Sequence, residues 1–156
     1  GTFQADFNLP KRLEAEYIGE DGSKHIPVMM HRAILGSFER FIGILIENYS
    51  GKLPLWLAPT QLSILTVTEE VKEYALSLKE KFDEINLRVE LDLRNEKIGY
   101  KIREHSNAKV PLMAVIGKDE MSANTVSIRN LHENETNTYS IDEAVSMLEK
   151  DSAHPK

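Results

Sequence analysis

The sequence of 156 residues contains no cysteine. This absence excludes disulfide bonds and thiolate metal ligands within the chain, so any metal ion would need histidine or carboxylate ligands. No run approaches the roughly 18 uninterrupted apolar residues of a membrane span, and the first residues lack the basic and then apolar order of a signal peptide. We therefore expect no membrane partner and a cytoplasmic location. The opening Gly1 and Thr2, without an initiator methionine, predict excision from a longer protein.

Positive charge is also scarce, because 19 Lys and Arg face 25 Asp and Glu and give a net charge of -6. This balance argues at first against a nucleic-acid partner, since affinity for a polyanion depends on clustered bases. Bases are nevertheless concentrated in residues 94–109, at Arg94, Lys97, Lys101, Arg103 and Lys109. The pattern fits a basic stripe that binds nucleic acid and an ordinary solvated helix face about equally well.

The first part of the chain has the pattern of an antiparallel sheet followed by one helix. Apolar and polar residues alternate over residues 2–9 and 13–19, and an Asp-Gly turn lies within residues 20–24, which predicts a meander. Residues 25–35 read as a further strand. Ser37 is a good N-cap candidate for an amphipathic helix that begins at Phe38, and Gly51 is its expected stop.

Pro54 and Pro59 interrupt regular structure and predict a boundary between domains at residues 1–52 and 53–156. After the boundary, strands and helices alternate, which predicts an α/β fold with a partly parallel sheet and helices against its faces. The polar residues 132–140 are expected to form a loop before a final helix, which a capping box of Ser140 and Glu143 begins. The other expected strands lie within residues 62–68, 87–93, 110–117 and 125–131, and the other expected helices after Thr68 and over residues 96–106.

Two residues near the first helix have chemical potential. His31 ends an apolar strand, and Arg40 lies in the first helical turn, where free backbone N–H groups and the helix dipole favour an anion. An arginine there can bind phosphate through two parallel hydrogen bonds. From spacing alone, however, a satisfied histidine and an Arg40 paired with Glu39 or another acid are the better interpretation.

A family resemblance changes this balance. The segment "VMMHRAILGSFERFIGILIENYSGKLPLWLAPTQ" resembles the third signature motif of class II aminoacyl-tRNA synthetases, and its histidine before "RAILGSFER" is similar to that of the threonyl-tRNA synthetase family. The similarity continues through "DLRNEKIGYKIREHSNAKVPLMAVIGKDE" and covers residues 1 to about 130. It implies a remnant of the antiparallel catalytic sheet with its motif 3 helix, followed by an anticodon-binding domain with a mixed five-stranded sheet flanked by helices.

The resemblance also implies a function, namely part of a threonine-tRNA ligase that activates threonine with ATP and Mg²⁺ and transfers it to threonine tRNA. It implies that Arg40 acts in catalysis by contacting ATP, and that His31 is one ligand of a zinc ion that holds threonine. The pocket for threonine and its adenylate would be lined by Thr2, Gln4, Ser37 and Arg40. The family's other signature motifs and zinc ligands would precede Gly1, so we expect this chain alone to be inactive and the dimer interface of the homodimeric parent to be mostly missing.

In the second domain, the resemblance implies five residues that contact the G and U shared by threonine anticodons. These residues are Asn95, Arg103, Lys109, Glu120 and Arg129. Without the resemblance, each except Arg103 would be read as a solvated polar residue. A non-catalytic tRNA-binding module and an unrelated α/β domain are the alternatives, and retention of His31, Ser37 and Arg40 favours the enzyme part over the binding module.

Overall fold

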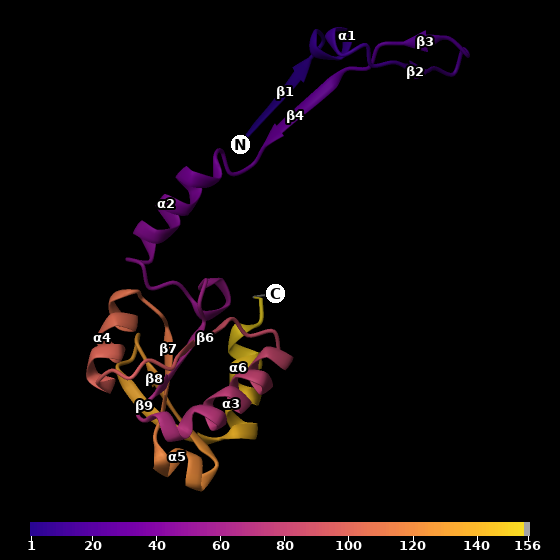
Figure 1. Ribbon diagram of the computed structural model, residues 1–156. Helices are drawn as coiled ribbons and strands as arrows, with labels where there is room; N and C mark the ends of the chain where they lie inside the picture. Colours follow the sequence, from indigo (N-terminus) through magenta and orange to yellow (C-terminus); the bar gives the residue numbers. More distant parts are fainter. Residues whose placement is uncertain (155–156) are drawn as a thin grey trace. The chain divides into compact units, whose positions relative to one another are not determined.

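A computed structural model describes residues 1–154 and divides the chain into two compact units, Gly1–Glu47 and a second from Asn48 onward. Figure 1 shows their elements in chain order. No helix within residues 1–154 combines the length and apolar character needed to cross a membrane.

Unit 1 contains two antiparallel strand pairs that are nested along the chain. β1 (Thr2–Asp6) pairs with β4 (Met29–Ala33), and β2 (Tyr17–Ile18) pairs with β3 (Lys24–His25). The antiparallel prediction is confirmed, but the predicted meander is wrong, because the first strand pairs with the last. The chain leaves β1 through Asp6, whose Oδ1 accepts the N–H groups of Asn8 (2.8 Å) and Leu9 (2.9 Å). The short helix α1 (Leu9–Arg12) follows, and of the second strand predicted over residues 13–19 only β2 is formed.

The helix predicted after Ser37 is α2 (Phe38–Asn48). Ser37 Oγ accepts the N–H of Arg40 at 3.3 Å, which confirms the predicted cap. The helix ends before Ser50 and Gly51, which both have positive φ angles, 51° and 75°. Among the described residues of unit 1, only Pro10 is buried. Large apolar side chains therefore remain exposed on α2, including Phe38, Phe41, Ile42, Ile44 and Ile46.

We expect unit 1 to open more readily than unit 2. Its strands form two-stranded sheets without a buried face, and such sheets are marginally stable in water. Native-state hydrogen exchange should therefore show lower protection before residue 50 than after it. Equal protection of the amides of β1, β4 and α2 and those of the β5–β7 core would contradict this expectation.

Unit 2 is built on one five-stranded sheet with the order β6-β5-β7-β8-β9. β5 runs parallel to β6 and β7, whereas β8 is antiparallel to β7 and to β9. The predicted mixed five-stranded sheet is therefore confirmed. Its strands are β5 (Leu62–Thr66), β6 (Val89–Asp92), β7 (Leu112–Ile116), β8 (Thr125–Asn130) and β9 (Glu135–Ser140).

The strand β9 corrects the prediction of a loop over residues 132–140. Only the turn at residues 131–134 is irregular, and the chain then returns antiparallel to β8 along the sheet edge. Five of the six residues of β9 are exposed, as in an edge strand, so the segment is polar. Tyr139 is the exception, since it lies opposite Val126 and packs against the core.

Helices cover the two faces of this sheet unequally. α3 (Lys72–Glu84), preceded by the turn η2 (Glu69–Val71), and α6 (Ile141–Ser152) pack on one face, and the predicted capping box of Ser140 and Glu143 is confirmed at the start of α6. α4 (Ile98–Asn107) lies on the other face against β5 (Figure 1). The core between the sheet and α3 and α6 is formed by alternate strand residues, among them Leu62, Ile64, Leu112, Ala114, Ile116, Val126 and Ile128.

The opposite alternation defines a second face, which we call the α4 face. It receives the side chains of Ser63, Met113, Ser127 and Arg129, because successive residues of a strand point to opposite sides. α4 reaches this face through Ser106, whose Oγ lies 4.0 Å from the sulfur of Met113. The remaining helix, α5 (Lys118–Ala123), lies beside β8.

The segment between Pro54 and Pro59 is attached to unit 2. It contains the turn η1 (Leu55–Leu57). The guanidinium of Arg88 donates to the carbonyl oxygens of Ala58 (3.0 and 2.7 Å) and Trp56 (2.9 Å). Gln61 adds a bond from its side-chain amide to Leu55 O at 2.8 Å. These bonds fix the entry of the chain into β5.

Candidate nucleic-acid interface

The basic segment 94–109 is not a continuous stripe. Lys97, Arg103 and Lys109 are exposed, but Lys101 is fully buried, with 0% of its surface accessible. Arg94 forms ion pairs with the carboxylates of Asp92 and Glu104. The reading as a stripe of five free bases is therefore wrong, because two of the five cations hold the protein together.

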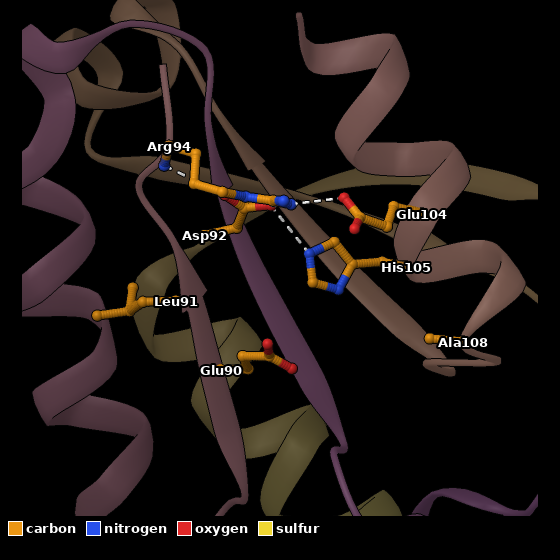
Figure 2. A pocket seen from close by; sticks show the side chains of 7 residues that line it. All are labelled: Glu90, Leu91, Asp92, Arg94, Glu104, His105 and Ala108. Carbon is orange, nitrogen blue, oxygen red and sulfur yellow. Dashed lines mark hydrogen bonds and ion pairs between the residues drawn. The ribbon is translucent and has the colours of Figure 1, made fainter. Parts of the chain in front are cut away.

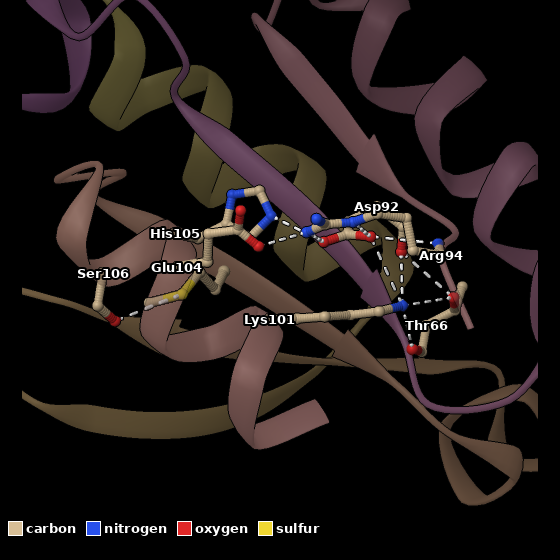
Figure 3. A network of polar contacts seen from close by, with 8 residues as sticks. Thr66, Asp92, Arg94, Lys101, Glu104, His105 and Ser106 are labelled. Carbon is tan, nitrogen blue, oxygen red and sulfur yellow. Dashed lines mark hydrogen bonds and ion pairs between the residues drawn. The ribbon is translucent and has the colours of Figure 1, made fainter. Parts of the chain in front are cut away.

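The buried ammonium group lies where two parallel strands end. Lys101 Nζ donates to the carbonyl oxygens of Thr66 (2.9 Å), the last residue of β5, and of Asp92 (3.0 Å), the last residue of β6. It also lies 3.7 Å from Asp92 Oδ1 (Figure 3). Carbonyl groups at strand ends lose their ladder partners, so a long side chain whose stem crosses the interior can satisfy both.

The carboxylate of Asp92 also contacts the side chains of Arg94 and His105. It accepts from Arg94 Nε (2.9 Å) and Nη2 (2.6 Å), and His105 Nε2 lies 3.1 Å away. The bonds from Arg94 hold the pKa of Asp92 well below its usual range, with further lowering by His105 and Lys101, and the same pairing raises the pKa of Arg94. We call Thr66, Asp92, Arg94, Lys101, Glu104 and His105 the Asp92 cluster.

A cavity of about 410 Å³ lies beside the Asp92 cluster (Figure 2). Apart from Glu90, its polar walls are the groups of the cluster, which already bind one another: Arg94 donates to both Asp92 and Glu104, and His105 lies within hydrogen-bond distance of Asp92. The lining residues are Glu90, Leu91, Asp92, Arg94, Glu104, His105 and Ala108. The arrangement is therefore a structural ion cluster, because its carboxylates are satisfied internally.

Three of the five predicted anticodon residues lie on or beside α4. Asn95 is exposed in the loop between β6 and α4, and Lys109 is exposed just after the helix with a positive φ of 59°. Arg103 follows Lys101 by two residues, so at 100° per residue it points away from the buried side of α4. The predicted helix is confirmed, but it begins at Ile98, so Lys97 precedes the helix instead of lying on it.

Glu120 is held in place by two hydrogen bonds. Its Oε1 accepts from Ser127 Oγ and its Oε2 accepts the N–H of Gly117, both at 2.8 Å. Ser127 Oγ lies 2.9 Å from Thr138 Oγ1 on β9. Burial alone would raise the pKa of Glu120, but the bonds from Ser127 and Gly117 lower it below its ordinary value. The side chain is therefore an ionised acceptor in a fixed position on the α4 face.

Arg129 shares this face, because it lies two residues along β8 from Ser127. The side chain is half-buried, and its Nη2 donates to Asn134 Oδ1 at 2.6 Å. Four N–H donors of the guanidinium are left for other partners. The structure thus brings Glu120 and Arg129 together through β8, and places Asn95, Arg103 and Lys109 around the helix that lies on the same face.

The residues predicted for the catalytic pocket lie in unit 1. Gln4 and His31 are directly opposite each other in the β1–β4 pair, and Thr2 lies on the same side of β1 as Gln4. His31 lies within β4 and does not end it, which corrects the prediction. A cavity of about 660 Å³ is lined by His31 and by Gln4, Ala5, Asp6, Phe7 and Asn8. Arg40 is exposed in the first turn of α2.

The metal-binding capacity of this cavity is small. His31 Nε2 lies 3.7 Å from Asp6 Oδ2, and the pKa of Asp6 is lowered mainly by the backbone N–H groups of Leu9 and Asn8. Residues 1–154 contain no group of three or more His, Asp or Glu side chains placed to hold a metal ion.

We expect the purified chain to retain no stoichiometric zinc after dialysis, because a tight zinc site needs three or four protein ligands. Atomic absorption measures the bound metal, with His31→Ala as the matched variant. Tight one-to-one binding by a monomer that His31→Ala abolishes would mean that ligands other than those identified complete the site.

Residues 61–151, more than half of the chain, match the family described as "Anticodon binding domain". The chain belongs to this family. Residues 1–49 match the "tRNA synthetase class II core domain (G, H, P, S and T)".

The chain is also similar to curated threonine-tRNA ligases, the family that its sequence resembles. It is 61% identical over 148 residues to the threonine-tRNA ligase of Ehrlichia canis (strain Jake), covering 95% of this chain and 23% of the relative. It is 55% identical over 155 residues to that of Caulobacter vibrioides (strain NA1000 / CB15N), covering 99% and 24%. The resemblance to threonyl-tRNA synthetases is confirmed, and the chain spans about a quarter of the length of these curated relatives.

A solved structure with a similar fold is the RNA binding domain of threonyl-tRNA synthetase from Cryptosporidium parvum Iowa II. It has 32% sequence identity and a TM-score of 0.73, and the match covers 96% of this chain and 38% of that chain. This match and the sheet of unit 2 confirm the predicted α/β class with a mixed sheet flanked by helices.

The sequence interpretation missed the Asp92 cluster and the Ser127–Thr138 pair. One signal for the cluster was present, because Ile98, Lys101, Ile102 and His105 recur at the spacing of one helix face. A lysine and a histidine between isoleucines on one side of a helix point to buried side chains with polar partners. No sequence pattern predicts the Ser127–Thr138 contact, because it joins residues from two different strands.

Proposed function

We propose that the chain is part of a threonine-tRNA ligase, which activates threonine with ATP and transfers it to threonine tRNA, and that unit 2 binds the anticodon. The observation that carries the proposal is the α4 face. This face carries Arg129 and Ser127, which binds Glu120, and Arg103 is exposed on α4; the domain matches the anticodon-binding family over residues 61–151.

The chemistry of these side chains suits unstacked bases. Arg103 and Arg129 can donate to the acceptor edges of bases and can stack on them, and Asn95 can both donate and accept. The ionised Glu120 accepts only, and each of its oxygens keeps a lone pair after bonding Ser127 or Gly117. It can therefore accept from the N–H groups of a guanine. Lys109 lacks the forked geometry of arginine, so we assign it a phosphate contact.

Electrostatic attraction contributes less than the composition of segment 94–109 suggests. Arg94 and Lys101 are engaged inside the Asp92 cluster, and the whole chain carries a net charge of -6. Of the five cations in segment 94–109, Lys97, Arg103 and Lys109 therefore remain to release counterions from RNA. Base contacts on the α4 face then have to supply much of the selectivity.

In unit 1, we propose that Arg40 contacts ATP and stabilises charge on the pyrophosphate leaving group. Thr2, Gln4 and Ser37 would line the pocket for threonine and its adenylate. His31 offers one imidazole to the cavity that it lines, which fits a single ligand of a zinc ion shared with residues outside this chain. Bound zinc would supply an open coordination position for the threonine amino and hydroxyl groups. ATP would arrive with Mg²⁺, and the complete enzyme would be a homodimer.

A gel-shift titration tests the proposed function. The full chain should bind threonine tRNA more tightly than the same tRNA with a substituted anticodon. A chain that binds both RNAs with equal affinity would be a general tRNA-binding module, and a chain that binds neither would contradict the assignment of unit 2. The coding sequence upstream of Gly1 tests the enzyme, because a non-catalytic module would lack the other two signature motifs.

A further inference from the structure

Lys101 is a buried cation that the proposed recognition of tRNA does not use. None of its surface is accessible, so it cannot contact an RNA. Burying an ammonium group costs free energy, and an apolar side chain of similar volume is often no less stabilising. The bonds of Lys101 therefore point to a role in placing other parts of unit 2.

Lys101 fixes α4 to the strand ends. The residue belongs to α4, and its Nζ donates to the last residues of β5 and β6 through Thr66 O (2.9 Å) and Asp92 O (3.0 Å). A bond from Thr66 Oγ1 to Asp92 O at 3.3 Å ties the same two strand ends to each other. The position of α4 along the sheet, and with it the position of Arg103, is set by these contacts.

The same cluster fixes the loop that carries Asn95. Arg94 lies next to Asn95 and donates from Nη2 to Asp92 Oδ2 (2.6 Å) at the end of β6 and to Glu104 Oε2 (2.7 Å) on α4. The loop is therefore anchored at once to the sheet and to the helix (Figures 2 and 3). Lys101 lies beneath this junction, 3.7 Å from Asp92 Oδ1.

We propose that Lys101 is a positioning residue for anticodon reading. By holding α4 to the ends of β5 and β6, it keeps Arg103 and Asn95 at a fixed spacing from Glu120 and Arg129 on the α4 face. Recognition of a base edge tolerates displacements of only about 0.5 Å, so a shift of α4 would lower discrimination without removing any contacting residue. This inference rests on the proposed anticodon-binding function.

The test compares Lys101→Met with a matched control, Lys72→Met, which makes the same chemical change at an exposed position of α3 on the opposite face. Dissociation constants of the full chain are measured for threonine tRNA and for an anticodon-substituted tRNA. Lys101→Met should narrow the ratio of the two constants by about tenfold, the scale of one lost base contact, whereas Lys72→Met should preserve the ratio. Amide hydrogen exchange at residues 93–97 should become faster in Lys101→Met and stay unchanged in Lys72→Met.

A second variant, Glu104→Gln, loosens only the partly exposed Arg94–Glu104 pair and leaves the buried core intact. It should also narrow the ratio and speed exchange at residues 93–97, so it decides the question if Lys101→Met does not fold. A folded variant with the wild-type ratio, or an equal loss of affinity for both tRNAs, would overturn the positioning role. Lack of discrimination by the wild-type chain would instead overturn the proposed function.

Discussion

Replacing Asp92 with alanine is expected to destabilise unit 2 by about 3–5 kcal/mol, the range for breaking a buried ion pair on one side. The substitution removes the carboxylate that binds Arg94 and His105 and leaves the ammonium of Lys101 buried without a counter-charge. Urea unfolding followed by circular dichroism measures the loss.

Asp83→Ala is the control for this experiment, because Asp83 forms an exposed ion pair with Lys79 on α3. Exposed pairs of this kind contribute little, so the midpoint of urea unfolding should hardly change. Similar midpoints for the two variants would mean that the Asp92 cluster does not stabilise the fold.

Acid should remove the contribution of Asp92. The bonds from Arg94 keep the folded-state pKa of Asp92 below its unfolded value, which is about 3.9. Stabilisation by the ionised carboxylate is therefore complete above about pH 4 and is lost as the pH falls through the folded pKa. The difference in unfolding free energy between the wild type and Asp92→Asn should shrink below about pH 4, and a difference that grows with acid would contradict this assignment.

Removing Arg103 is expected to cost about 1–3 kcal/mol of binding to threonine tRNA and to narrow the affinity gap to an anticodon mutant. Its side chain is exposed on α4, opposite the buried Lys101, and is free to donate to a base. Lys97 precedes α4 and is at most a phosphate contact. Lys97→Ala should weaken the binding of both tRNAs alike and lower the slope of log affinity against log salt concentration by about one.

Titrations of Arg103→Ala and Lys97→Ala at several salt concentrations separate the two roles. If Lys97→Ala reduces the difference in affinity between threonine tRNA and the anticodon mutant and Arg103→Ala does not, the assignment of base reading to the exposed side of α4 is wrong.

Much of the sheet in unit 2 could be predicted from sequence, because β7 is a continuous apolar run, the strands β5, β6 and β8 are rich in β-forming or alternating apolar residues, and α6 carries a clear start signal. β7 and the Ser140–Glu143 capping box are examples. β9 was missed because an edge strand can expose polar side chains on both faces, and Thr136, Asn137 and Thr138 have no apolar alternation. The pairing in unit 1 was missed because Asp6 turns the chain after β1 through local bonds to Asn8 and Leu9.

The candidate site was harder to predict than the fold. Composition alone gave Lys101 and Arg103 the same character, yet one is buried and the other is exposed, because neighbouring isoleucines select the inward side of α4. The fixed position of Glu120 depends on Ser127 and Thr138, and these come from strands whose pairing is a tertiary property. The family resemblance supplied the five anticodon residues, which local pattern would have left as surface.

Binding of the threonine anticodon to the α4 face of unit 2 can be observed by amide chemical-shift mapping of the full chain, titrated with an RNA hairpin that carries this anticodon. We expect perturbations at Asn95, Arg103, Glu120 and Arg129, with α3 and α6 on the opposite face unaffected. Perturbations confined to α3 and α6, or the same pattern with a hairpin of unrelated anticodon and equal affinity, would contradict this expectation.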